Sequence, residues 1–334
     1  MSVTTVRRTL ARDVRAAAGS VRLQGSVHAV RRLGGMTFFI LRDRSGTVQV
    51  VTHGKDDLPL EAVVEVFGRA QRDERAPGGV EVAAEEITVL ARPVAALPFD
   101  ISKPALAASL ETVLDHRPVS LRHPSVRGVF RIAAALVAGF RRHLETQGFI
   151  EIHTSKLVAA ATEGGANLFR VDYRGRPAFL AQSPQLYKQI CVGAFERVFE
   201  VGPAYRNEPH ETTRHLNEYT SLDVEMGFTD LEGLLDLESG LLAAMLQTVA
   251  AETGDALEAV GVTLPSITHI PRLRLSEAQA RLHATGRSYA SDDDLDPEGE
   301  RLLGQQMAAE GHDFVFVTHY PAAVRPFYAL PDPG

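Results

Sequence analysis

Short apolar runs that partly alternate with polar residues fill the first ninety positions of the chain. Five of these runs lie between Val21 and Leu90, and turn-forming segments such as RDRSG and RAPGG separate them. Runs of this length and spacing are typical of strands joined by tight turns. The pattern therefore predicts a small five-stranded β-barrel, preceded by a short basic helix over residues 1–15.

A different pattern begins beyond the predicted barrel. The proline-spaced stretch PVAALPFDISKP predicts a linker. From residue 125 to 147, apolar side chains recur at steps of three and four, which predicts an amphipathic helix. Gly148 is placed to end that helix, and FIEIHT follows as a predicted strand.

Further helices and strands complete this second region. Thr229 and Glu232 have the spacing of a capping box ahead of a leucine-rich helix, and Ser276 and Gln279 have it ahead of a shorter one. Helices that frame hairpin strands, without regular strand–helix alternation, favour an α+β domain with an antiparallel sheet. We therefore expect an OB-type barrel over residues 1–92, a linker over 93–108 and an α+β domain over 109–334.

Composition narrows the class of protein without assigning a function. The chain has 334 residues, of which 45% are hydrophobic, and this is enough for two packed domains. The N-terminal sequence lacks the apolar segment of a secretory signal, and no apolar run has the length that a membrane helix needs. The single Cys191 excludes an internal disulfide. We expect a cytoplasmic protein with no membrane partner.

Charge is unevenly distributed along the chain. The net charge is −7, yet residues 1–75 hold thirteen Lys/Arg against eight Asp/Glu, which is +5 and leaves −12 for the remainder. A basic N-terminal segment followed by an acidic remainder predicts that contact with nucleic acid begins in the N-terminal region.

Residues 199–228 hold the densest candidate chemistry. They begin as an apolar strand, turn polar over 206–217, and return as a strand with Asp223 and Glu225 at alternating positions. Strand, charged loop and strand predict a hairpin. Arginines in the loop could bind a polyphosphate, because guanidinium groups match phosphate oxygens. A solvated hairpin tip would also be charged, so these residues alone leave both interpretations open.

The ordered segments YRNE and RHLNEYTSLDVE favour the first interpretation. They resemble motif 2 of the class II aminoacyl-tRNA synthetases, in the aspartyl, asparaginyl and lysyl subgroup. The resemblance implies ATP with Mg²⁺, and it implies that Arg206 stabilises charge at the α-phosphate. The implied ATP contacts are Arg206, Glu208 at the adenine amine, Arg214 and His215 at the outer phosphates, Leu216, and Tyr219 stacked on the adenine. Asp223 would hold the amino group of aspartate, and no metal ligand is assigned.

Three upstream stretches follow in the order of the same family. HLETQGFIEIHTSKLV resembles motif 1, which builds a homodimer interface, although Ser155 stands where the family has proline. TEGGANLF resembles a mobile loop in which Glu163 would bind the substrate ammonium. QSPQLYKQ resembles the amino-acid pocket, in which Ser183 and Gln185 would contact aspartate and Lys188 would bind its side-chain carboxylate.

The identity of the amino acid depends on Lys188. A neutral amide would leave a buried cation uncompensated, so lysine here favours aspartate over asparagine. The implied reaction activates aspartate as an adenylate and transfers it to tRNA. An asparaginyl enzyme remains the alternative.

The predicted barrel contains FFILRDRSGTVQ, which resembles the anticodon-binding domain of this subgroup. Phe38 would stack on an anticodon base and Gln49 would recognise the central uridine. In the archaeal-type aspartyl branch, His28 and Pro77 match positions associated with accepting both tRNA(Asp) and tRNA(Asn).

The resemblance ends with VRPFYALPDPG. Motif 3, which bears a further ATP-binding arginine, is not found in the chain. We therefore expect a catalytic domain that is incomplete at its C-terminal end. A tRNA-binding fragment without activity is a second alternative.

Overall fold

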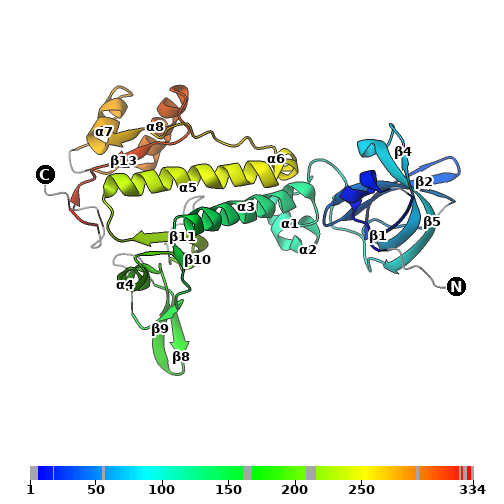
Figure 1. The fold of residues 1–334 in the computed structure, drawn as a ribbon, viewed down its shortest axis with the longest axis horizontal. Helices are drawn as coiled ribbons and strands as arrows, with labels where there is room; N and C mark the ends of the chain where they lie inside the picture. The colour runs from blue at the N-terminus through cyan, green and yellow to red at the C-terminus, as the bar shows by residue number, and fades with distance from the viewer. Residues whose placement is uncertain are drawn as a thin grey trace. The chain divides into compact units, whose positions relative to one another are not determined.

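The structure is a computed structural model that describes residues 7–17, 19–54, 57–160, 168–207, 216–290, 293–322, 325 and 329–331. Packing divides the chain into two compact units, Met1–Arg127 and Gly128–Gly334. Each unit is described by itself (Figure 1).

The first unit contains a closed five-stranded barrel with the order β1-β2-β3-β5-β4. Its strands are β1 (Ser20–Leu33), β2 (Met36–Asp43), β3 (Gly46–His53), β4 (Val63–Arg72) and β5 (Val80–Ala91). All neighbouring strands are antiparallel except β3 and β5, which are parallel. The predicted closed barrel is confirmed.

Alternation along the strands builds the barrel core. Leu23 and Val27 of β1, Phe39 and Leu41 of β2, and Val50 of β3 are all buried in it. The predicted basic helix is shorter than expected: among the described residues it is a 3₁₀ helix, η1 (Ala11–Ala16), which contributes Ala11 and Val14 to the same core. A second short 3₁₀ turn, η2 (Pro77–Gly79), joins β4 to β5.

The segment after the barrel packs within the first unit. It carries α1 (Leu110–Asp115) and α2 (Arg117–Ser120), and the Ser109 hydroxyl caps α1 by accepting from Thr112 N. Beyond α2, Arg122 donates to the buried Glu61 carboxylate over 2.8 Å. Arg42 of β2 donates to the same oxygen over 2.8 Å, so one buried carboxylate ties this segment to the barrel.

The second unit is built on a three-stranded sheet of order β11-β10-β6. Its strands are β10 (Arg197–Tyr205) and β11 (Glu218–Met226), which form the predicted hairpin, and β6 (Ile150–Glu151), which is parallel to β10. A second small sheet has the order β7-β9-β8, with strands β7 (Leu157–Val158), β9 (Arg176–Leu180) and β8 (Arg170–Tyr173).

Two long helices lie against one face of the β10–β11 sheet (Figure 1). They are α3 (Pro124–Thr146), which lies over the predicted range, and α5 (Leu231–Glu252). Gly139 lets them approach, because an added Cβ there would lie 2.9 Å from the Cα of Met245. Gly148 has a φ of 80°, as a helix-ending glycine requires. The expected α+β architecture is confirmed.

Helix α5 is long and apolar enough to cross a membrane by length and composition. Its sequence is not an uninterrupted apolar run, because Glu232, Asp236 and Glu238 lie within it. Leu241 and Met245 of the helix are buried against α3 and the sheet, while 22% of its most apolar stretch is buried in all.

Helix α6 (Gly254–Val260) packs on α3, where a Cβ on Gly128 would lie 2.8 Å from Val260 Cγ2. The remaining elements, β12 (Arg272–Arg274), α7 (Leu275–His283), α8 (Pro297–Ala309) and β13 (Phe316–Thr318), pack around a cluster of their own. Strands β12 and β13 are parallel, and Leu275, Leu282, Leu303 and Met307 are buried between α7 and α8.

Two local predictions were wrong. Helix α5 is capped by Asp230, whose carboxylate accepts from Gly233 N, and not by a Thr229–Glu232 box. Helix α7 begins one residue before Ser276, and its first turn is closed by Glu277, which accepts from Arg274 N over 2.7 Å.

Candidate active site and nucleic-acid interface

The β10–β11 hairpin has one apolar and one polar face. Its two strands pair so that Glu200 lies opposite Asp223 and Val198 lies opposite Glu225. Since residues directly opposite share a face, alternate positions separate the two kinds of side chain. Phe199, Val201, Leu222, Val224 and Met226 pack on the helices, whereas Glu200, Tyr219, Ser221, Asp223 and Glu225 occupy the other face. The alternation of acids predicted from the sequence thus places both acids on one face.

Lys188 meets these acids from α4 (Gln185–Phe195). Its Nζ lies 3.2 Å from Asp223 Oδ1 and 3.5 Å from Glu225 Oε2. The lysine side chain is only 12% exposed, and Ser221 Oγ donates to the second oxygen of Asp223. The structure therefore brings together two of the residues expected at the aspartate site, and Lys188 already has two anionic neighbours.

The segment that leads into α4 is buried. Gln182, Ser183 and Gln185 all have low exposure, and Ser183 Oγ accepts from Gln185 N over 3.1 Å. Ser183 and Gln185 are thus fixed at the start of the helix that carries Lys188. Polar side chains that are buried and oriented in this way are suited to binding a small polar ligand.

A further charged group on this face was not found from the sequence. Glu200 is 3% exposed and accepts from Thr154 N, Thr154 Oγ and Lys156 Nζ, the last over 2.7 Å. A Cβ on Gly202 would lie 3.2 Å from Lys156 Cε, so this glycine leaves room for the lysine. The only sequence signal was Glu200 itself, an acid in an otherwise apolar strand.

The expected ATP contacts are described in part. The Arg206 guanidinium lies 5.9 Å from the Tyr219 ring centroid, which places a cation beside an aromatic face at the loop end of the hairpin. Leu216 is 59% exposed beside them. Glu208, Arg214 and His215 lie outside the described residues, as does Glu163. The described pair fits a nucleotide, whose base can stack and whose phosphates are anionic.

Metal ligands are not evident in the described ranges. No three His, Cys, Asp or Glu side chains there lie close enough to hold an ion. The acids on the polar face are already paired, Glu200 with Lys156 and Asp223 with Lys188.

The barrel carries a separate pocket of about 180 Å³ near the β1–β2 turn. Phe38 and Gln49, both expected at an anticodon site, line it, and the Arg31 guanidinium lies 5.4 Å from the Phe38 ring centroid. Gln49 Nε2 donates to buried Glu81 over 2.8 Å, and Gln71 Nε2 donates to its other oxygen over 2.8 Å. Because a carboxylate only accepts, Glu81 holds the Gln49 amide with its oxygen free for a ligand.

His28 and Pro77 do not line this pocket. His28 is the extra residue of a β-bulge in β1, which turns its side chain to Arg42, and Arg42 Nη1 donates to His28 Nδ1 over 2.8 Å. Burial and the Arg42 charge lower the pKa of His28. Pro77 lies in η2, where the neighbouring Gly78 faces the Arg15 guanidinium.

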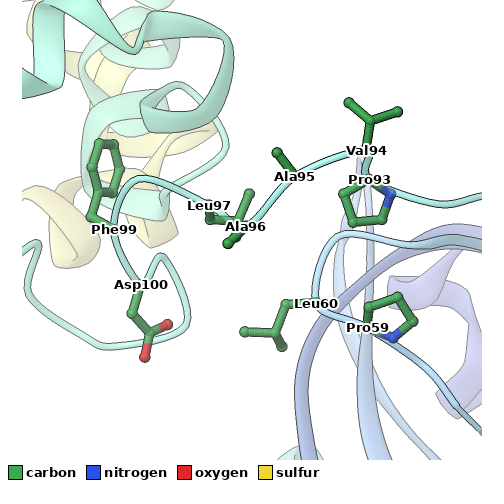
Figure 2. Close-up of a pocket in the computed structure, with 9 residues that line it drawn as sticks. All are labelled: Pro59, Leu60, Pro93, Val94, Ala95, Ala96, Leu97, Phe99 and Asp100. Atoms are coloured by element: carbon green, nitrogen blue, oxygen red, sulfur yellow. The ribbon is translucent and has the colours of Figure 1, made fainter.

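A larger pocket of about 610 Å³ lies where the linker passes the barrel (Figure 2). Its lining is apolar except for Asp100, and the pKa of that carboxyl is lowered by hydrogen bonds from Ser102. Without further polar groups it has no evident chemistry.

Comparisons with known proteins match both units. Residues 109–333 match the family model of tRNA synthetases class II (D, K and N), and residues 21–90 match that of the OB-fold nucleic acid binding domain.

Individual relatives cover almost the whole chain. Aspartate–tRNA(Asp/Asn) ligases of Deinococcus radiodurans and Thermus thermophilus are each 49% identical, over 98% and 97% of this chain and 76% and 78% of their own length. Among solved structures, asparaginyl-tRNA synthetase from Pyrococcus horikoshii with asparaginyl-adenylate has a TM-score of 0.89 at 31% identity, covering 98% of this chain and 78% of that one.

Proposed function

The chain belongs to the class II tRNA synthetases of the D, K and N group, and we propose that it is an aspartate–tRNA ligase acting on tRNA(Asp) and tRNA(Asn). The observation that carries the proposal is Lys188, a nearly buried cation of α4 that contacts Asp223 on the polar face of the hairpin. Two relatives with 49% identity carry the name of this activity. The substrate is L-aspartate, activated with ATP.

Aspartate binds by exchanging ion-pair partners. The contacts of Lys188 with Asp223 and Glu225, at 3.2 and 3.5 Å, are longer than a tight charge-assisted hydrogen bond. The substrate brings both a carboxylate for Lys188 and an ammonium for the Asp223 that it displaces. Because the two charges enter together, the net charge of the group is unchanged by the exchange of partners.

Activation joins aspartate to the nucleotide. The aspartate α-carboxylate attacks the α-phosphorus, an O–P bond forms, and the bond to pyrophosphate breaks. Arg206 faces the α-phosphate and Tyr219 the adenine ring, so these two residues orient the reacting atoms. Ser183 and Gln185 orient the amino acid, and Glu163, Glu208, Arg214, His215 and Leu216 complete the proposed contacts. Mg²⁺ accompanies the phosphates.

Transfer then uses the tRNA. The ribose 3′-hydroxyl attacks the adenylate carbonyl, and AMP leaves. In the barrel, Phe38 stacks on an anticodon base and the free oxygen of Gln49 accepts from the N3–H of uridine. His28 and Pro77, whose side chains lie outside that pocket, contribute to acceptance of both tRNAs.

Assembly and location follow the family. We propose a homodimer formed through the motif 1 segment, where Ile150 and Leu157 are exposed apolar side chains. The protein acts in the cytoplasm, with the barrel over residues 1–92, the linker over 93–108 and the catalytic domain over 109–334.

Asparagine is the competing substrate. The neutralisation of Lys188 by two acids favours it, because a neutral amide needs no free cation. The similarity to an asparaginyl-tRNA synthetase at 31% identity supports the same alternative.

Exchange of labelled pyrophosphate into ATP by the full chain tests the proposal. We expect exchange with aspartate at a rate on the order of 100-fold above that with asparagine, because one charge separates the two side chains. Exchange with asparagine would assign the alternative. No exchange with either, beside intact tRNA binding, would leave an RNA-binding protein without activation.

A further inference from the structure

The first unit has a further hollow, which is lined by arginines. It has a volume of about 600 Å³ and lies where the C-terminal end of β2 pairs with the middle of β1, at Arg42 and Ser26. Five of its lining residues are Arg8, Arg42, Arg44, Arg122 and Arg127, and its single acid is Asp43. We refer to this hollow as the arginine cleft.

Its acid does not face a ligand. The Asp43 side chain is 1% exposed and accepts from Ala11 N, Ser45 N and Ser45 Oγ. This carboxylate therefore ties η1 and the β2–β3 turn together. Arg8 lies 4.0 Å from it, and the Arg8 side chain remains 40% exposed.

The arginines differ in how much of their charge is available. Arg42 is buried, and with Arg122 it shares the carboxylate of Glu61, which neutralises one of these two charges. Arg44 is exposed, and no residue in the described ranges forms an ion pair with it. Arg8 and Arg44 are therefore the exposed cations on which a ligand contact can be argued.

The cleft also has an apolar wall. Leu90 is 52% exposed and Val63 is 37% exposed on its barrel side, and Leu121 lines the opposite side. Exposed apolar side chains beneath guanidinium groups suit a ligand that combines anionic groups with apolar surface, as a sugar–phosphate chain does.

We propose that the arginine cleft binds backbone phosphates of the tRNA outside the anticodon. Arg44 and Arg8 make the phosphate contacts. Arg42 and Arg122 hold the barrel and the segment after it together, and these two parts form the walls of the cleft. Strand β2 runs from Phe38 to Arg42, about 13 Å at the usual rise. A nucleic acid whose loop occupies the Phe38 pocket thus has the cleft within reach of neighbouring nucleotides. This inference rests on the proposed function, because that function supplies the RNA.

The test uses the full chain and varies only exposed arginines. The Arg8→Ala/Arg44→Ala variant removes the two accessible cations. Arg42 and Arg122 are left in place, because their loss would leave Glu61 buried and unpaired. Arg75→Ala is the matched control, since Arg75 is a barrel arginine with a 91% exposed side chain outside the cleft.

Binding of a tRNA(Asp) transcript is measured across a range of salt concentrations. We expect the double variant to bind on the order of tenfold more weakly at low salt, and the slope of log K against log salt to fall by roughly 1.5. The control keeps the wild-type slope. An isolated anticodon-loop oligonucleotide binds both proteins equally.

Other results overturn the proposal. A double variant with the slope of Arg75→Ala would remove the cleft from the interface while leaving the proposed function intact. Loss of pyrophosphate binding, with tRNA binding unchanged, would assign the cleft to free polyphosphate. A wild-type chain that fails to bind the transcript would instead contradict the proposed function.

Discussion

The Phe38 pocket of the barrel and the polar face of the hairpin prepare their ligand groups in opposite ways. In the barrel, Glu81 accepts from Gln49 and Gln71, and the Gln49 oxygen is left free. On the hairpin, the cation expected to bind substrate is already paired with Asp223. The neutral amide proposed to recognise uridine is thus oriented before a ligand binds. The cation proposed to bind the substrate carboxylate must first leave its present partner.

The difference follows from the cost of isolating a charge. An amide that faces a pocket loses little when no ligand is present, but a nearly buried ammonium without an anion is strongly disfavoured. Lys188 is 12% exposed, so it needs a carboxylate when no substrate is bound. We expect the acids that hold it to set how readily aspartate enters.

The largest effect is expected from removing the cation. Lys188→Met leaves Asp223 and Glu225 facing the pocket without a counter-charge, and the substrate carboxylate would be repelled. We expect aspartate-dependent pyrophosphate exchange to fall by about 100-fold or more, since loss of one partner of a buried pair costs roughly 3 kcal/mol.

A lysine outside the site provides the control for this change. Lys103→Met removes a 70% exposed lysine and should leave exchange and tRNA binding unchanged. The Lys188 variant should still bind the tRNA transcript. If it activates aspartate at the wild-type rate, Lys188 does not select the amino acid.

The sequence predicted the elements better than their contacts. Alternation of apolar residues identified β1 to β5, and steps of three and four identified α3, because these patterns depend on one element at a time. The cap of α5 was missed because Thr229 and Asp230 are both suitable residues, and only the backbone geometry decides between them.

The same limit applies to the sites. The sequence predicted acids at alternating positions, Asp223 and Glu225, and the strand places both on one face. Glu81 and Lys156 were missed because their partners, Gln49 and Glu200, lie 32 and 44 residues away along the chain. Only the pairing of distant strands and loops brings these groups together.

An intermediate effect is expected when the Gln49 amide in the barrel is no longer held by the Glu81 carboxylate. Glu81→Gln supplies a donor as well as an acceptor, so Gln49 can turn its nitrogen to the pocket. Preference for uridine over cytidine at the central anticodon position should then fall by about fivefold, the value of one neutral hydrogen bond. Binding of two transcripts that differ at that base measures the ratio.

An exposed acid on the same strand controls for the loss of charge. Glu85→Gln removes a carboxylate that pairs with Arg69 on the surface, and the ratio should not change. An unchanged ratio in the Glu81 variant would mean that the amide orientation does not determine the base preference.

The smallest effect is expected from His28, which belongs to a network of charged side chains in the barrel. Burial, and secondarily the Arg42 charge, lower the pKa of His28 from its ordinary 6.5, and Nδ1 must stay unprotonated to accept from Arg42. Below pH 6.5 the unfolded chain therefore binds a proton that the folded barrel does not. The free energy of unfolding should fall as the pH falls from 6.5 towards the lowered pKa, and this contribution should be constant above 6.5.

His28→Gln should remove that contribution and reduce the loss of Tm between about pH 7.5 and about pH 5.5 by a few degrees at most. Thermal unfolding of the full chain, followed with a probe on the barrel, measures it, and His53→Gln controls for the loss of an exposed barrel histidine. An identical pH dependence in wild type and His28→Gln would mean that the Arg42 contact does not depend on an unprotonated histidine. The barrel would then tolerate an added positive charge beside Arg42 and Arg122, whereas removal of the Lys188 charge is expected to leave Asp223 and Glu225 without a counter-charge.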